Sequence, residues 1–174
     1  MRSFSLLLGL LGLNILEPCA PLTTVEEPLP QKRNCGGCTA CCTAMANSAV
    51  EPPKPTFSSC QFQCADGCSI HADKPQGCRE FNCLWVQDTG KLFKEDERPD
   101  KFGIVAVAEC TQFGPTIRIY ESTDGALRRE DVQELIHFWA QKVAVLAIVR
   151  GGKRFLYGKP KVLELARKLG AVKE

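Results

Sequence analysis

The feature that most constrains this chain is the crowding of its cysteines. Nine of the 11 cysteines lie between Cys35 and Cys83, and the other two are Cys19 and Cys110. The crowded segment has few aliphatic residues, a proline-rich loop over 51–55 and no regular hydrophobic period. Such a segment cannot bury enough apolar surface to order itself, so we expect cross-links to supply the missing stability.

Two kinds of cross-link are open, namely disulfides in an oxidising compartment and metal–thiolate bonds in a reducing one. Cys41 and Cys42 are adjacent and cannot readily pair with each other, and cysteines three residues apart make strained bridges, although distant partners remain open. Closing a zinc site contributes roughly 10–16 kcal/mol of apparent folding free energy. We therefore expect a metal-binding module, with a disulfide-stapled secreted protein as an alternative.

The cysteines fall into two blocks whose spacing suits metal ligation. In the first block, CGGCTACC, cysteines separated by two residues can sit on one tight turn, and Gly36 and Gly37 relieve its strain and leave amides free to donate to sulfur. Two separated blocks are the layout expected when two loops converge on one centre. The predicted metal ligands are Cys35, Cys38, Cys41, Cys42, Cys60, Cys64, Cys68, Cys78 and Cys83.

The strings CGGCTACC and GCSIHADKPQGCREFNCLW resemble the YkgJ-type cysteine-cluster family, described as zinc- or iron-chelating domains. The residues that match its motifs are Cys35, Cys38, Cys41, Cys42, Cys60, Cys64, Cys68, Cys78, Arg79, Phe81, Cys83 and Trp85. His71 stands where the family usually has tyrosine, Lys74 where arginine is common, and the Cys60–Cys64 spacing is one residue longer than usual. The resemblance is most specific over 35–85 and implies metal chelation without naming an activity.

The ligands alone do not select the metal. Four thiolates suit tetrahedral zinc, and nine cover two sites or a shared-thiolate pair with one to spare. Iron–sulfur clusters need the same ligands, and Phe81 and Trp85 beside Cys78 and Cys83 would shield a cluster from water. We predict zinc or iron as the cofactor, favour zinc, and interpret His71 as a polar neighbour of the site.

Standard catalytic signatures are missing. The sequence has no G-x-S-x-G, phosphate-binding loop, G-x-G-x-x-G or H-E-x-x-H motif, and only two histidines. Full thiolate ligation also closes a metal to water, which favours a structural site over an enzyme. The alternative is an iron–sulfur or thiol-based redox or electron-transfer protein.

Four further residues lie near the cysteines or in the predicted α+β half. Arg79 either donates to a thiolate or forms a surface ion pair. We interpret His137 as a surface or packing residue and Trp139 as part of the core. Cys110, at the end of a predicted strand, is expected to be a small buried hydrophobic residue.

The second half of the chain has regular hydrophobic periods. Strands are predicted over 103–109, 116–121, 143–149 and 154–157, helices over 129–142 and 161–173, and a tight turn at Gly151-Gly152. This order predicts an α+β fold, in which an irregular cysteine-rich metal-binding module packs on a small mixed sheet with two helices.

The chain divides into an apolar segment over 1–20, a proline-containing linker over 21–34, the cysteine-cluster module over 35–90 and a small α+β subdomain over 100–174. The apolar run from Phe4 to Leu16 is too short to span a bilayer, so no stable membrane span is expected. The run resembles the hydrophobic core of a signal peptide. The alternatives are that an upstream start codon was wrongly chosen, or that the run forms an ordinary buried helix. We predict a cytoplasmic protein, with export as the alternative.

The expected partners are a metal ion and an unidentified protein that meets the folded module. A net charge of +2, with the basic residues scattered among acids, gives no argument for nucleic acid.

Overall fold

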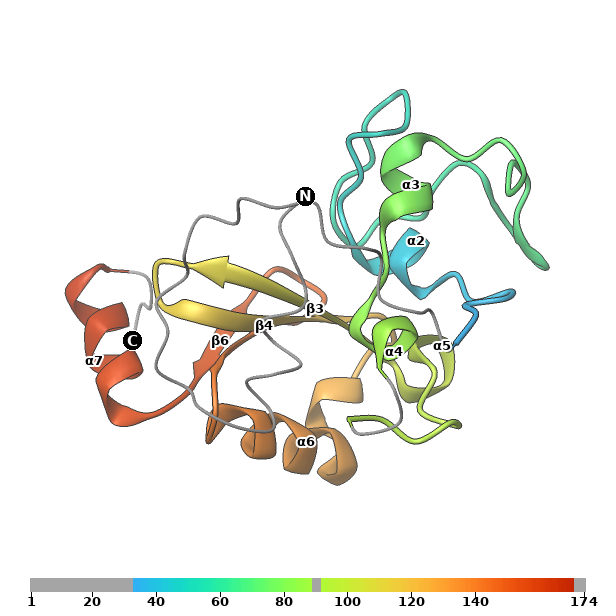
Figure 1. Cartoon of the computed structure of the whole chain (residues 1–174). Coiled ribbons are helices and arrows are strands. Elements are labelled where there is room, and N and C mark those ends of the chain that lie inside the picture. Colours follow the sequence, from blue (N-terminus) through green and yellow to red (C-terminus); the bar gives the residue numbers. More distant parts are fainter. Residues whose placement is uncertain (1–32, 89–91, 171–174) are drawn as a thin grey trace, which may run out of the picture.

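The computed structural model describes residues 33–88 and 92–170 of the 174-residue chain (Figure 1). It contains a mixed four-stranded sheet, a two-stranded sheet and helices, so the predicted α+β class is confirmed. The predictions for residues 1–20 and for the linker before Arg33 lie outside the described residues.

The four-stranded sheet has the order β3-β4-β5-β6. Its strands are β3 (Ile104–Thr111), β4 (Gly114–Glu121), β5 (Ala144–Ile148) and β6 (Arg154–Tyr157). β3 pairs antiparallel with β4, β4 parallel with β5, and β5 antiparallel with β6. Parallel neighbours need a crossover connection, which α6 (Glu130–Ala140) supplies. All four predicted strands are confirmed, and Gly151 and Gly152 form the turn with φ of 97° and 85°.

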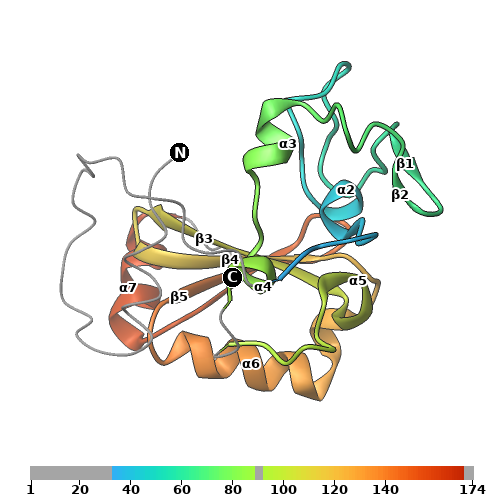
Figure 2. The ribbon, with the colours of Figure 1, turned by 45° about the vertical axis from the view of Figure 1, so that its right-hand side comes forward.

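Helix α6 covers one face of the sheet (Figure 2). Val132, Ile136 and Trp139 are 0 % exposed and belong to the same core as Ile117 of β4. Trp139 also meets Phe93 edge to face, with ring centroids 5.5 Å apart. Burying a large apolar side chain contributes about 1.5–3 kcal/mol, so this face stabilises the subdomain strongly. The prediction that Trp139 belongs to the core is confirmed.

Helix α7 (Pro160–Lys168) lies at the end of the sheet farthest from the cysteine segment (Figure 1). It is shorter than the predicted 161–173, and Gly170 follows it with φ of 64°, the left-handed conformation typical of a residue after a helix. Leu165 and Leu169 remain 39 % and 52 % exposed. Within 33–88 and 92–170, every helix is too short or too polar to cross a membrane.

Residues 35–88, here called the cysteine module, lie on the opposite side of the sheet from α6 (Figures 1 and 2). The elements are α2 (Ala40–Ala44), β1 (Gln63–Cys64), β2 (Gly67–Cys68), α3 (Gln76–Glu80) and α4 (Leu84–Gln87), and α5 (Pro99–Phe102) then leads into β3. α2 and α4 pack against β3. Ala44 is 0 % exposed, and Leu84 and Trp85 are 3 % and 4 % exposed, so these short helices share the core of the sheet.

A buried ion pair joins the two ends of the cysteine module. The Arg33 guanidinium donates to Asp88 Oδ2 at 3.3 Å and to the carbonyl of Phe93 at 2.8 Å, and it lies 4.9 Å from the centre of the Trp85 ring. The Asp88 carboxylate also accepts the amides of Leu92 and Phe93, each at 3.0 Å. The side chains of Arg33 and Asp88 are 8 % and 0 % exposed. This clasp therefore holds the start of the module beside its end.

Replacing Asp88 with alanine is expected to lower the free energy of unfolding by about 3–5 kcal/mol, because it removes the buried counter-ion of the Arg33 guanidinium and the acceptor of the Leu92 and Phe93 amides. Urea denaturation followed by circular dichroism measures the loss. Glu95→Gln is the matched control, since Glu95 bonds the same guanidinium at 3.0 Å but is 81 % exposed. Its expected loss is below about 1 kcal/mol. Equal losses in the two variants would contradict a stabilising role for the buried clasp.

Candidate metal centre

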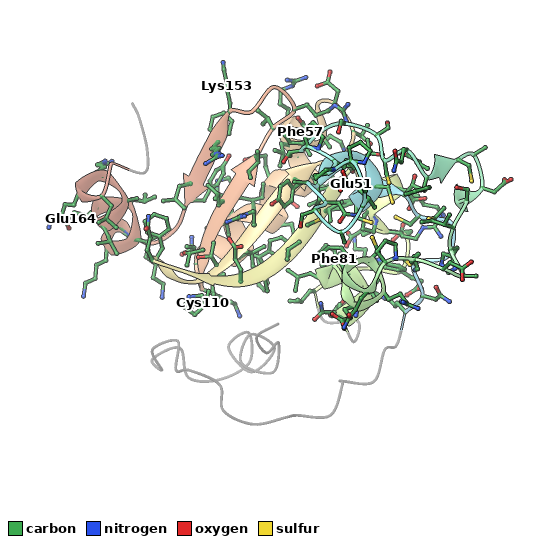
Figure 3. The ribbon with its side chains drawn as sticks, turned by 90° about the horizontal axis from the view of Figure 1, so that it is seen from above. Glu51, Phe57, Phe81, Cys110, Lys153 and Glu164 are labelled. Atoms are coloured by element: carbon green, nitrogen blue, oxygen red, sulfur yellow. The ribbon has the colours of Figure 1, made fainter. Side chains whose placement is uncertain are left out.

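A pocket of about 550 Å³ lies within the cysteine module. Eight of the nine predicted ligands line it, namely Cys35, Cys38, Cys41, Cys42, Cys60, Cys68, Cys78 and Cys83. The ninth, Cys64, is exposed and does not line the pocket. The sulfur atoms gather on the side of the molecule that carries this module, while Cys110 lies apart on the sheet (Figure 3). The structure thus brings the two predicted blocks together around one space.

The first block follows a tight turn into a short helix. The amide of Cys38 donates to the carbonyl of Cys35 at 2.9 Å, and Gly36 takes φ of 52° within this turn. The amide of Gly36 is held by Asn34 Oδ1 at 2.9 Å, so it is not free to donate to sulfur as the sequence suggested. α2 then begins at Ala40 and carries the adjacent thiols of Cys41 and Cys42.

Backbone and side-chain hydrogen bonds join the second block to the first. The amide of Cys60 donates to the carbonyl of Cys42 at 2.9 Å. Asn47, in a β-bridge with Lys54, donates through Nδ2 to the sulfur of Cys78 at 3.1 Å. A hydrogen-bond donor to sulfur favours the thiolate form and fixes the direction in which the sulfur points. Residues just outside a metal's ligands orient the ligands in this way.

One group of thiols is buried deeply enough to resist ionisation. Burial raises the pKa of Cys38 to about 11, with a further rise from the negative charges of Asp100 and Cys83. Burial also raises the pKa of Cys83, and charge on Cys35 adds to the rise. Several thiolates in one buried space are costly unless a cation compensates them. These thiols therefore ionise together only with a positive partner.

The adjacent pair behaves differently. A hydrogen bond from Cys41 lowers the pKa of Cys42 to about 6, and the same bond, with burial, raises the pKa of Cys41. The positive charges of Lys54 and Lys74 also favour the Cys42 thiolate. The pocket therefore holds one thiolate near neutral pH even without metal.

Lys54 is a pocket residue that the sequence analysis missed. It is only 6 % exposed, and its Nζ donates to the carbonyls of Met45 and Pro55. Burial lowers its pKa, and charges on Cys60 and Cys42 oppose that shift. A lysine in a loop gives no periodic signal that would have indicated its burial.

The other predicted residues have mixed outcomes. His71 is an exposed lining residue of the pocket, with its Nε2 3.4 Å from Lys74 Nζ, and its interpretation as a polar neighbour stays a prediction. Arg79 also lines the pocket, but its guanidinium forms neither a hydrogen bond nor an ion pair within the described part of the chain. The prediction for Cys110 is wrong, because this residue is exposed at the hairpin end of β3 and is disulfide-bonded.

The pocket supplies a fitting donor set but not a finished coordination shell. Among residues 33–88 and 92–170, no three side chains of His, Cys, Asp or Glu stand close enough together to hold a metal ion. Soft thiolates are nonetheless the donors that zinc and iron–sulfur clusters select, and eight of them border this space. Because the unfolded chain rarely holds a preformed site, binding of a metal here would be coupled to folding of the module. The ligand assignment therefore stays a prediction.

Comparison with known proteins adds no relative, because no protein-family model, curated protein or solved structure matches the chain. The resemblance to the YkgJ-type family rests on the quoted motifs alone.

Cys42 is expected to react fastest with iodoacetamide among the pocket thiols of the metal-free protein at pH 7. Its pKa of about 6 makes it mostly thiolate there, so its rate should rise through pH 6 and level off above it. Cys38, with a pKa of about 11, should react roughly 10–100-fold more slowly, because its greater intrinsic nucleophilicity offsets only part of its small thiolate fraction. Peptide mass spectrometry measures both rates.

The Cys41→Ala variant tests the cause of this reactivity. Alanine removes the S–H donor, so the pKa of Cys42 should rise and its rate profile should move to higher pH. An unchanged profile would show that the Cys41 hydrogen bond does not lower this pKa.

Proposed function

We propose that the chain is a metal-binding protein whose cysteine module closes around zinc held by the thiolates of its pocket. The observation that carries the proposal is the convergence of eight cysteines, from segments up to 48 residues apart in sequence (83 − 35), on one space. This module has no extended hydrophobic core of its own, and a metal joining its segments would stabilise it.

Eight thiols are the number that two tetrahedral zinc sites require. Charge interactions link Cys83 with Cys35, Cys38 and Cys41, which makes these four the first candidate set. The second set contains the remaining lining cysteines, Cys42, Cys60, Cys68 and Cys78. Cys64 is the spare thiol. This choice of Cys64 rests on its absence from the pocket lining.

The lysines beside the pocket fit such a centre. Two divalent ions would leave eight thiolates with excess negative charge, and Lys54 and Lys74 both favour the nearby Cys42 thiolate. With all positions taken by sulfur, the metal is closed to water, so the site is structural and we propose no reaction for it. An unidentified protein that meets the folded module remains the proposed partner.

A reducing, cytoplasmic location follows from the same proposal, because the nine cysteines from Cys35 to Cys83 are free thiols. The disulfide at Cys110 favours the exported alternative, as does the signal-peptide-like run from Phe4 to Leu16.

The second candidate function is an iron–sulfur or thiol redox protein. It is favoured by the lowered pKa of Cys42 beside Cys41, since a thiolate next to a second thiol is the arrangement that oxidants attack. Phe81, Val86 and Val105 line the same pocket and would partly shield a cluster from water.

Metal analysis of protein purified under anaerobic, reducing conditions separates these functions. The proposal predicts about two zinc ions per chain in a colourless protein. Cys60→Ser and Cys83→Ser should each lose at least one ion and melt at lower temperature, whereas Cys64→Ser should keep both. Equal metal content in the three variants would contradict the ligand assignment. Iron with acid-labile sulfide would favour the second function, and a folded, metal-free, fully oxidised protein would exclude both.

Asn47→Asp is expected to weaken zinc binding about 10–100-fold, the usual effect of losing a residue that orients a metal ligand. The aspartate keeps the Oδ1 acceptor for the amide of Ala49 but replaces the donor to Cys78 with a negative charge. Competition with a chromophoric chelator measures the affinity. Gln112→Glu makes the same amide-to-carboxylate change at an exposed residue between β3 and β4, outside the pocket lining, and should leave the zinc affinity within about twofold. Equal weakening in both variants would show an effect of charge alone.

A further inference from the structure

The sheet face that carries the cysteine module is only partly covered by it. Looking down on this face, Figure 3 shows the module over one side of the sheet, with Phe57 near its inner edge and the turn of Lys153 beyond. The strand register places Arg118 beside Leu146 and Tyr120 beside Ile148 on this face. Arg154 of β6 pairs with Ile148 and extends the same surface.

A groove lies along the edge of the cysteine module formed by Ala46, Thr56 and Phe57. Its volume of about 600 Å³ is typical of small-molecule sites. Its lining residues come from the cysteine module, β4, β5, the β5–β6 turn and the first residue of β6, Arg154. Ala46 alone also lines the cysteine pocket, so the groove is a separate site. No atom lies within 4 Å of the Cβ position at Gly151 or Gly152, which leaves this end open.

Phe57 forms the wall of the groove on the module side in an unusual backbone conformation. Its φ is 62°, the left-handed region that bulky residues rarely adopt, while its amide donates to the carbonyl of Ala44 at 3.2 Å. Strained backbone of this kind concentrates at binding sites. Here it places an aromatic side chain opposite the floor formed by Leu146 and Ile148.

The charges that line the groove are all positive. Arg118 and Arg154 are its charged residues, and no carboxylate lines it in the described part of the chain. Arg118 is partly neutralised by Glu109 at 2.6 Å, and its Nη1 lies 3.4 Å from the Tyr120 hydroxyl. The Arg154 guanidinium has no ion-pair partner within residues 33–88 and 92–170. About one positive charge thus remains without a counter-ion.

We propose that this groove binds a small organic anion, with its carboxylate on Arg154 and the Tyr120 hydroxyl and its apolar body between Phe57 and the Leu146–Ile148 floor. Arginine matches a carboxylate with two parallel hydrogen bonds. The partial neutralisation of Arg118 and the apolar floor favour a carboxylate with a hydrophobic body over inorganic phosphate. This site does not depend on the metal centre proposed above.

Benzoate is a suitable probe, with neutral benzamide as its matched comparison. Two-dimensional NMR of the nitrogen-15-labelled full chain should show saturable shifts of the amides of Gly151, Gly152 and Arg154 on adding benzoate. Benzamide should bind at least about tenfold more weakly, because it lacks the charge that arginine recognises. Inorganic phosphate should also bind more weakly than benzoate.

Arg154→Gln should weaken benzoate binding about tenfold, the effect of losing one charge-assisted contact. Arg154 is exposed on an edge strand, so the variant should fold normally. Lys153→Gln removes the same charge one residue away, outside the groove lining, and should change the affinity by less than about twofold. Absence of saturable shifts in these amides, equal weakening in both variants, or equal or tighter binding of benzamide or phosphate would overturn the proposal.

Discussion

Thiolates crowded around one pocket repel each other, so residues 35–88 cannot carry several charged sulfurs without a compensating cation. Burial raises the pKa of Cys38 and Cys83, so these thiols resist carrying charge side by side. A metal ion reverses this effect, because each thiolate then gains a cation at bonding distance. The crowding that opposes ionisation of the thiols therefore favours binding of a metal ion.

The clasp between Arg33 and Asp88 and the sheet beneath it make this crowding possible. Cys35 follows Arg33 by two residues and Cys83 precedes Asp88 by five, so the ion pair holds these two cysteines near each other. The Asp88 carboxylate also accepts the amide of Phe93, whose ring packs against Trp139. The α6 side of the sheet supplies the buried apolar surface that the module lacks. Stability thus comes from a conventional core on one face, while the candidate chemistry lies on the other.

Local patterns predicted the sheet and its main helix, because the spacing of apolar residues, every second residue in a strand and every 3.6 in a helix, can be recognised within a short stretch of sequence. They failed at Cys110, since β3 is buried from Ile104 to Ala106 and becomes exposed at its hairpin end. Spacing identified the cysteine blocks, but only the three-dimensional arrangement shows that Cys64 lies outside the pocket. The Arg33–Asp88 pair and the groove join segments far apart in sequence, which no local pattern reports.

The central claim is that pocket cysteines ligate metal with sulfur alone. X-ray absorption at the zinc edge of the full chain, purified with its native metal, tests it most directly. The account predicts four sulfur neighbours per zinc at about 2.3 Å and no nitrogen or oxygen shell near 2.0–2.1 Å. Zinc ligated mainly by nitrogen or oxygen, or bound far below one ion per chain, would contradict it.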